Sequence, residues 1–353
     1  MTLELAWFCL IGLALAVYIV LDGFDIGVGI IHRIVARSPE ERRLTQATIG
    51  PVWDGNEVWL LAAGGTLFLA FPKMYAVAIG GFYLPVQMLL WLFIGRALGI
   101  EMKHHAIGGP VWAELWDTIF SLSSLAIAVF LGVALGNVVR GVDFYASGRF
   151  FAPLWTGFSP FDARVGILDV YTLLIGATAA TALAFHGALW LYDRTQGPVA
   201  ERSSTLARKL FVASAALVGL TSAATLYVQP LALDAVRERP ALLVFPVAAA
   251  GALVLCRVEM NRGRSRRAFL ASSAFLGLMF ATAAASLYPN LLPTKSPSAS
   301  GLTVENAAAS SYALGVGLIW YIPGLLLTAS YFFRNYRRLP ERLSTSDLDA
   351  HHD

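Results

Sequence analysis

The sequence predicts an all-α fold, a polytopic integral membrane bundle of about nine transmembrane helices. Of the 353 residues, 57% are hydrophobic and only 14% are charged, whereas soluble domains devote about a quarter of their residues to charge. The hydrophobic residues form long runs, and a bilayer core of roughly 30 Å needs about 20 apolar residues as a helix. The runs lack the alternation of barrel strands. This composition excludes an ordinary soluble enzyme, a disordered chain and a nucleic-acid-binding domain.

Nine candidate spans follow one another along the chain. The first begins without a basic segment and carries no Ala-x-Ala cleavage site, which predicts a retained helix rather than a signal peptide. The second and third are separated only by residues 71–73, which predicts a tight hairpin. The seventh is short and contains Pro246. The nine ranges are 5–30, 52–71, 74–98, 116–138, 167–191, 208–230, 240–257, 267–289 and 311–333.

The connections between these spans are too short to form folded domains. We therefore expect a single membrane domain over residues 1–353. It comprises helices one to four with the acidic cluster (1–138), helices five to nine (167–333) and a cytoplasmic tail (334–353). The longest connection, 139–166, is rich in aromatic residues, which predicts a cap at headgroup depth on the outer face.

Positive charges are unequally divided between alternate connections. With the N-terminus outside, 19 of the 26 Lys and Arg residues fall on the inner side. Cytoplasmic loops carry an excess of Lys and Arg. The distribution therefore predicts an external N-terminus and a cytoplasmic C-terminus, as an odd number of spans requires.

Two carboxylates lie near the end of the first span, in the segment DGFDIGVG. Asp22 and Asp25 are three residues apart and so share one helical face. An ionised Asp within a bilayer costs roughly 2.5–3.5 kcal/mol on insertion scales, so such side chains normally face a polar interior. Gly23 and Gly27 would let a neighbouring helix approach closely. The alternative is that the acids lie near the cytoplasmic interface and only pair with Arg33 or cap a loop.

A second pair of acids opens the second span. Asp54 and Glu57 are again three residues apart, with Asn56 between them and Trp53 and Trp59 on either side. Carboxylates near a helix N-terminus are stabilised by the helix dipole, so capping would account for one of them. Two acids beside two tryptophans exceed what capping needs. A desolvated carboxyl can exchange a proton near neutral pH, which proton transfer requires.

Further charged residues extend this acidic cluster. Arg96 and Glu101 lie near the end of the third span, and Asp117 begins the fourth. Titratable groups at one membrane depth on neighbouring helices predict a proton path or a coordinating site. The alternative is a salt-bridge network that only locks the bundle, for example Asp25 or Asp54 with Arg96.

The sequence predicts neither a metal site nor a haem site within the chain. Cys9 and Cys256 lie in apolar runs and form no CxxC or zinc spacing. Only His186 lies well within a span, whereas bis-histidine ligation of haem needs two imidazoles at matching depth. A lone His is more often a buried hydrogen-bonding residue. A self-contained redox catalyst is therefore not expected.

Four sequence strings carry a resemblance to a known family. They are LDGFDIGVGI (21–30), GPVWDGNEVWL (50–60), GGFYLP (80–85) and ALGN (134–137). They resemble subunit II of the bd-type quinol oxidases, the cytochrome d ubiquinol oxidase subunit II family, which includes cyanide-insensitive forms. The match is dense from the first to the fourth span and looser towards the C-terminus.

The resemblance implies a function, partners and cofactors. Complexes of this family oxidise quinol, reduce oxygen to water and generate a proton gradient in the bacterial cytoplasmic (inner) membrane. Subunit I carries the ligands of haem b and haem d and the quinol-binding loop, so this chain would be the non-haem-ligating half of a heterodimer. A structural quinone and a small single-helix accessory subunit are further components that the resemblance leaves open.

The resemblance also assigns residues. By position, Asp25 and Asp54 match acids implicated in proton uptake from the cytoplasm. The expected proton path is Asp25, Asp54, Glu57 and Glu101, and the expected supporting polar or packing residues are Asp22, Arg96, Asp117, Gly23, Gly27, Trp53, Asn56 and Trp59.

Two rival functions belong to different classes. One is an ion- or proton-coupled transporter, against which stand the lack of paired half-helix breaks and of an internal repeat. The other is a purely structural scaffold for a haem subunit. A transporter should act alone in liposomes, whereas an oxidase subunit should be colourless and inert until its haem-bearing partner is supplied.

Overall fold

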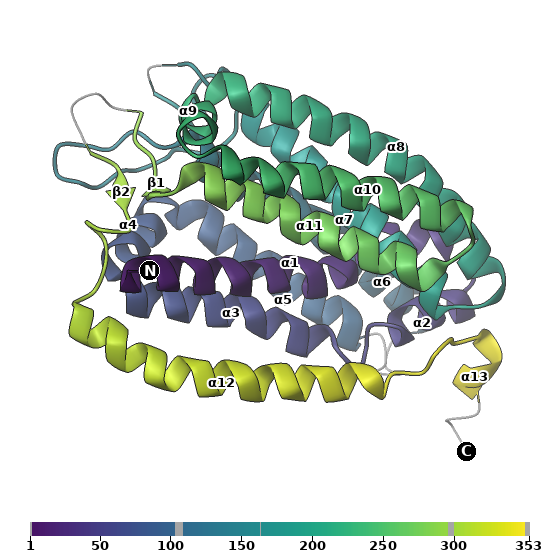
Figure 1. The fold of residues 1–353 in the computed structure, drawn as a ribbon. Coiled ribbons are helices and arrows are strands. Elements are labelled where there is room, and N and C mark those ends of the chain that lie inside the picture. Colours follow the sequence, from purple (N-terminus) through teal and green to yellow (C-terminus); the bar gives the residue numbers. More distant parts are fainter. Residues whose placement is uncertain (1, 103–108, 163, 296–299, 350–353) are drawn as a thin grey trace.

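The computed structural model describes residues 2–102, 109–162, 164–295 and 300–349. These residues form a bundle of long helices whose axes run roughly side by side, with the start of α1 and the short helix α13 at opposite ends (Figure 1). The long helices are α1 (Leu3–Val35), α3 (Trp53–Ala70), α5 (Tyr83–Glu101), α6 (Gly109–Arg140), α7 (Val170–Arg194), α8 (Gly197–Val228), α10 (Val244–Asn261), α11 (Ser265–Leu287) and α12 (Ser311–Arg337).

Short elements lie at the two ends of the bundle. They are α2 (Pro39–Ala47), α4 (Pro72–Gly81), α9 (Leu231–Glu238), a 3₁₀ helix (Pro240–Leu243), α13 (Thr345–Asp349) and the paired strands β1 (Asn290–Leu292) and β2 (Leu302–Thr303). We call the end with α2 and α13 the basic end and the end with α4, α9 and the strands the cap end (Figure 1). Which end faces the cytoplasm stays a prediction.

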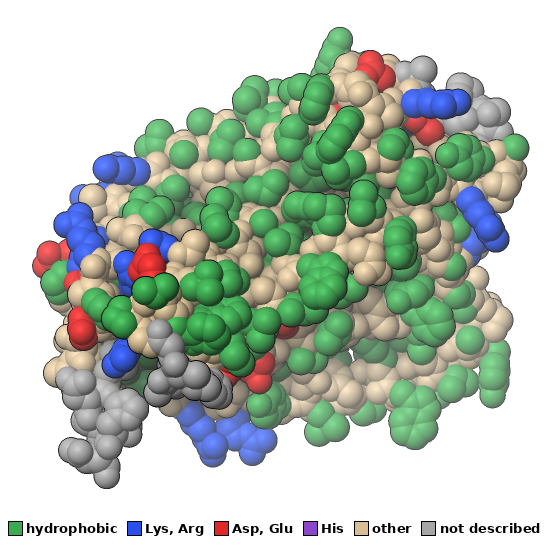
Figure 2. Space-filling model, turned by 180° about the vertical axis from the view of Figure 1, so that it is seen from behind, with side chains coloured by type: hydrophobic (Ala, Val, Ile, Leu, Met, Phe, Trp, Pro, Cys, Tyr) green, Lys and Arg blue, Asp and Glu red, His purple; other side chains and the backbone are tan. Residues whose placement is uncertain are grey.

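The predicted all-α bundle of about nine spans is confirmed. Within the described ranges, eight helices are individually long and apolar enough to cross a membrane, and α3 together with α4 makes a ninth candidate. One face shows hydrophobic side chains over its middle, with most Lys and Arg side chains towards the two ends (Figure 2). That distribution suits a protein whose middle contacts lipid or other apolar partners.

The predicted tight hairpin at residues 71–73 is wrong. The chain turns by 120° between α3 and α4, and only α5 returns through the bundle. Two prolines explain the breaks, because proline has no N–H for the helical ladder. Pro72 begins α4, and Pro85 leaves the carbonyl of Gly81 free to accept a hydrogen bond from the Ala152 amide at 3.2 Å.

The first helix lies at the centre of the packing that positions the site. It packs against α3, α6, α7 and α11. Glycines permit the contact with α7, since a Cβ on Gly27 would lie 2.0 Å from the Leu183 carbonyl oxygen and 2.8 Å from the Gly187 nitrogen. The backbones of α1 and α7 therefore touch at this point, which fixes the rotation of α1 and the direction in which its acids point.

Candidate functional site

A fully buried arginine joins three helices towards the basic end. Arg96 of α5 donates to both carboxylate oxygens of Asp22 on α1, at 2.7 and 3.2 Å, and to Oε1 of Glu57 on α3 at 2.7 Å. The side chains of Asp22 and Arg96 are 0% exposed, and that of Glu57 is 25% exposed. The alternative pairings of Asp22 with Arg33 and of Arg96 with Asp25 or Asp54 are wrong. Helix rotation selects the partners, because Asp22 and Glu57 are the acids that face α5.

Asp25 lies one helical turn from Asp22 and has different partners. Its Oδ2 accepts a hydrogen bond from Asn56 Nδ2 at 2.7 Å, and Asn56 Oδ1 accepts one from the Tyr336 hydroxyl at 2.8 Å. Asp25 is completely buried, and its Oδ1 has no hydrogen-bond partner within the described ranges. Buried polar atoms are normally paired with protein or water. The free oxygen therefore marks a place where a water molecule or a proton can be held.

Asp54 lies apart from these buried groups. Its side chain is exposed and accepts a hydrogen bond from the neighbouring Gly55 amide at 2.7 Å. It borders a shallow groove of about 520 Å³ between α3 and α12, which Leu327, Tyr331 and Phe332 also line. Asp54 thus sits at the surface and Asp25 in the interior, both near the N-terminal part of α3.

Asp117 belongs to a second cluster, nearer the basic end. Its Oδ1 faces His32 Nε2 at 2.9 Å, and its Oδ2 accepts from Arg42 of α2 at 3.3 Å. His32 Nδ1 faces Thr45 Oγ1 at 2.7 Å. His32 is seven residues from Asp25, about 10 Å along the helix. The expectation of one acidic cluster at a single depth is therefore wrong. Glu101 is not one of the residues that make up these two clusters, and it is exposed at the end of α5.

The remaining predicted residues line or support these groups. Asn56 is fully buried, Trp59 is 6% exposed and packs in one cluster with Tyr18, and Trp53 packs against a larger core cluster. Sequence reasoning missed Tyr336 and the His32–Asp117 contact. Tyr336 lies 280 residues from Asn56, and no local pattern indicates such a pair.

The described imidazoles are committed to protein contacts. His186 is buried on α7, with Nδ1 2.6 Å from Ser272 Oγ and Nε2 3.1 Å from the Val20 carbonyl oxygen. Both ring nitrogens of His32 are also in contact, as described above. His104, His105, His351 and His352 lie outside the described residues.

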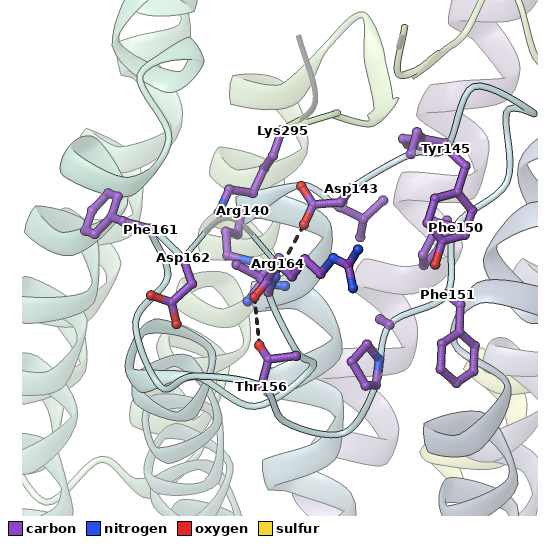
Figure 3. A pocket seen from close by; sticks show the side chains of 15 residues that line it. Arg140, Asp143, Tyr145, Phe150, Phe151, Thr156, Phe161, Asp162, Arg164 and Lys295 are labelled. Carbon is purple, nitrogen blue, oxygen red and sulfur yellow. Dashed lines mark hydrogen bonds between the residues drawn. The ribbon is translucent and has the colours of Figure 1, made fainter. Parts of the chain in front are cut away.

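A larger cavity, of about 830 Å³, lies at the opposite, cap end of the molecule. Phe161 stands on one side and Phe150 on the other, with charged side chains between them (Figure 3). Arg140, which lines this cavity, is already paired with Asp169 and donates to Asn137 Oδ1 at 2.7 Å. Burial lowers the pKa of Lys295, and the nearby positive charge of Arg140 lowers it further. Arg140 serves to join the end of α6 to the start of α7.

Comparison with known proteins places the chain in a family. The family model described as cytochrome bd terminal oxidase subunit II matches residues 3–339. The chain is 30% identical to a probable cytochrome oxidase subunit 2 of Haemophilus influenzae, with 98% of this chain and 97% of that protein covered. It is 28% identical to the cytochrome bd-I ubiquinol oxidase subunit 2 of Escherichia coli K12, with the same coverage.

A solved structure agrees with this placement at the level of the fold. The bd oxidase structure from Geobacillus thermodenitrificans contains a chain that matches with a TM-score of 0.77 and 19% identity, over 96% of this chain and 98% of that one. The resemblance inferred from the sequence is confirmed. The chain is a multi-pass membrane protein. It therefore belongs to the cytochrome bd terminal oxidase subunit II family, whose members are subunits of an oxidoreductase complex.

Proposed function

We propose that this chain is the non-haem-ligating subunit of a bd-type quinol:oxygen oxidoreductase in the bacterial cytoplasmic membrane. In this proposal it supports a haem-bearing subunit I and delivers protons from the cytoplasm for the reduction of oxygen to water. Its family membership supports the first part. The buried carboxylates of α1 and α3 support the second.

The charge balance of the buried cluster carries the proton-delivery proposal. Two carboxylates, Asp22 and Glu57, pair with Arg96, and a third, Asp25, lies one helical turn from Asp22. Among the described residues, Arg96 is the one cation that contacts any of the three. A buried charge without compensation costs several kcal/mol. The bidentate pair with Arg96 compensates Asp22. At least one of the other carboxyls is therefore expected to be neutral, and a group that holds a proton in a buried site can also pass it on.

The positions of the acids suggest an order. Asp54 is exposed at the surface, Glu57 is one turn further along α3 and a quarter exposed, and Asp25 is enclosed. A proton would be taken up near Asp54 and passed towards Asp25 and Glu57. Glu101 lies at the end of α5, where it would add negative charge on the side from which protons arrive.

The chain's own histidines suit a partner that carries the haems. Both described imidazoles already contact protein groups on both ring nitrogens, so neither is free to ligate iron without breaking a buried contact. Haem b and haem d would be held by the partner subunit, where they supply the electron transfer and oxygen chemistry. This chain would contribute protons and structural support.

Asparagine substitutions test the proton proposal. Asn is nearly isosteric with Asp but cannot take and release a proton near neutral pH. We expect Asp54→Asn and Asp25→Asn to preserve the haem content of the purified complex and to slow quinol oxidation per haem severely, with part of the rate kept in Asp54→Glu. Asp234→Asn, an exposed acid on α9 at the cap end, is the matched control and should leave the rate unchanged.

The rival functions predict other outcomes. A scaffold role predicts normal rates per haem in both variants or a loss of assembly without a change in the rate of the assembled complex. A transporter role predicts ion flux in liposomes that contain this chain alone. A normal rate per haem in both Asp54→Asn and Asp25→Asn would end the proton-delivery proposal.

A further inference from the structure

Tyr336 reaches the buried Asp25 site from the periphery of the bundle. It lies in the last turn of α12, a helix whose one buried residue, Leu314, is near the opposite end. The Tyr336 ring nonetheless packs against Phe24 at a centroid distance of 6.4 Å. Its hydroxyl meets Asn56 Oδ1 at 2.8 Å. A mostly exposed helix thus places one polar group on the amide that contacts Asp25, one of the two fully buried acids of the site.

The contacts of Asn56 determine the direction of these hydrogen bonds. Nδ2 of Asn56 lies 3.3 Å from the Leu21 carbonyl oxygen, which can only accept, and 2.7 Å from Asp25 Oδ2. The amide nitrogen must therefore face α1, and Oδ1 must face α12, where the Tyr336 hydroxyl donates to it. Without this donor, Asn56 Oδ1 would be a buried acceptor lacking a partner, and the amide would have less reason to hold this orientation.

The C-terminal segment holds the end of α12 in place. We define the strap as residues 339–343. The Leu343 amide donates to the Arg194 carbonyl at 2.8 Å, and the Leu343 carbonyl accepts from the Gln196 amide at 3.0 Å. Arg194 donates from its side chain to the Pro340 carbonyl at 2.9 Å. Leu339 and Leu343 pack against the core cluster that also contacts Tyr336. The strap therefore ties α12 to the α7–α8 turn.

We propose that Tyr336, held by the strap, is a positioning residue that orients Asn56 and thereby selects which oxygen of Asp25 exchanges its proton. Asn56 occupies Oδ2 of Asp25, and Oδ1 is left free. The exchanging oxygen is then Oδ1. This inference rests on the proposed role of Asp25 in proton delivery.

The test uses the intact two-subunit complex with three single substitutions. Tyr336→Phe removes only the hydroxyl, Asp25→Asn removes the acid, and Tyr321→Phe makes the same change as Tyr336→Phe in the half of the same helix that is nearer the cap end. Quinol oxidation per haem is measured, together with the infrared carbonyl band of a protonated carboxyl that disappears in Asp25→Asn. A neutral hydrogen bond contributes about 0.5–1.5 kcal/mol, so Tyr336→Phe should slow turnover by about two- to twelve-fold.

A purely structural role for Tyr336 would not change the Asp25 infrared band in the assembled complex. We expect Tyr336→Phe to shift that band and Tyr321→Phe to leave both the band and the rate unchanged. The substitution of both strap leucines, Leu339→Ala with Leu343→Ala, should shift the band in the same direction as Tyr336→Phe while the Tyr336 hydroxyl is retained.

The outcomes separate this inference from the function on which it rests. A slowed Asp25→Asn complex together with an unshifted band and a normal rate in Tyr336→Phe would overturn the positioning role and leave proton delivery standing. A normal rate per haem in Asp25→Asn, or the absence of a carboxyl band that Asp25→Asn removes, would overturn the role of Asp25 and the role of Tyr336 with it.

Discussion

Removal of the buried cation Arg96 should destabilise the protein more than removal of any surface arginine. In Arg96→Met, the aliphatic volume is largely kept, but Asp22 loses both of its hydrogen-bond donors from Arg96. Glu57 loses its donor as well, although it is 25% exposed and can be hydrated. Asp22 has no access to water. The penalty therefore comes chiefly from one uncompensated buried carboxylate.

The expected magnitude follows from this burial. Breaking a buried ion pair by removing one partner costs about 3–5 kcal/mol. At about 2 °C per kcal/mol for a large domain, the thermal midpoint should fall by about 6–10 °C. Replacing both partners with apolar residues is often neutral, because no charge is then left buried. Arg96→Met with Asp22→Leu should thus recover most of the loss.

Thermal unfolding of the purified complex measures this coupling. The wild type, the two single variants and the double variant form a double-mutant cycle. Arg33→Met is the matched control, since the Arg33–Glu114 pair is 36% and 47% exposed and such pairs contribute about 0–1 kcal/mol. If the double variant is as unstable as the sum of the two single variants, within about 0.5 kcal/mol, then Arg96 and Asp22 are not a coupled pair and the reasoning fails.

Two further predictions concern packing and pH. Gly27→Ala should sharply reduce the yield of assembled complex, because the new Cβ would lie 2.0 Å from a backbone oxygen of α7. Gly12→Ala on the same helix is the control, since no atom of this chain lies within 4 Å of its new Cβ. Equal yields of the two variants would contradict the close approach of α1 and α7. Glu41 is partly buried, which by itself raises its pKa, but its hydrogen bonds with Arg202 and with backbone amides lower the pKa overall. A carboxyl whose pKa is lowered on folding stabilises the protein above its unfolded pKa of about 4.3 and loses that contribution as the pH falls through the folded value. The thermal midpoint should therefore fall less between pH 6 and pH 3 in Glu41→Gln than in the wild type, and equal falls would exclude this contribution.

The sequence alone determined the membrane bundle and its family. A bilayer admits helices of a minimum apolar length, so nine long runs in a chain with 14% charged residues leave few alternatives. The sequence also determined that Asp22 and Asp25 share a face of α1, because residues three apart are neighbours on any helix. These features depend on distances of a few residues along the chain.

The division of the predicted third span into α4 and α5 depends on contacts with other parts of the chain. Pro72 and Pro85 are visible in the sequence. Whether a proline kinks a helix or ends it depends on which donors hydrogen-bond to the backbone carbonyls that are left without a helical partner. Here Ala152 of the cap-end loop donates to the carbonyl of Gly81, which Pro85 leaves free, and Ala309 donates to the carbonyl of Ala70, the last residue of α3. Hydropathy does not record those partners, so the sequence predicted a continuous third span.

Only the tertiary structure decided which charges meet. Arg96 could reach several acids by its depth in the membrane, and the contact of Gly27 with the backbone of α7 sets the rotation of α1 that turns Asp22 towards it. Tyr336 contacts Asn56, 280 residues away in the sequence, because the strap ties the end of α12 to the α7–α8 turn. Local periodicity specifies the face on which a side chain lies, whereas its partner depends on the packing of the whole chain, and that packing separates the exposed Asp54 from the enclosed Asp25.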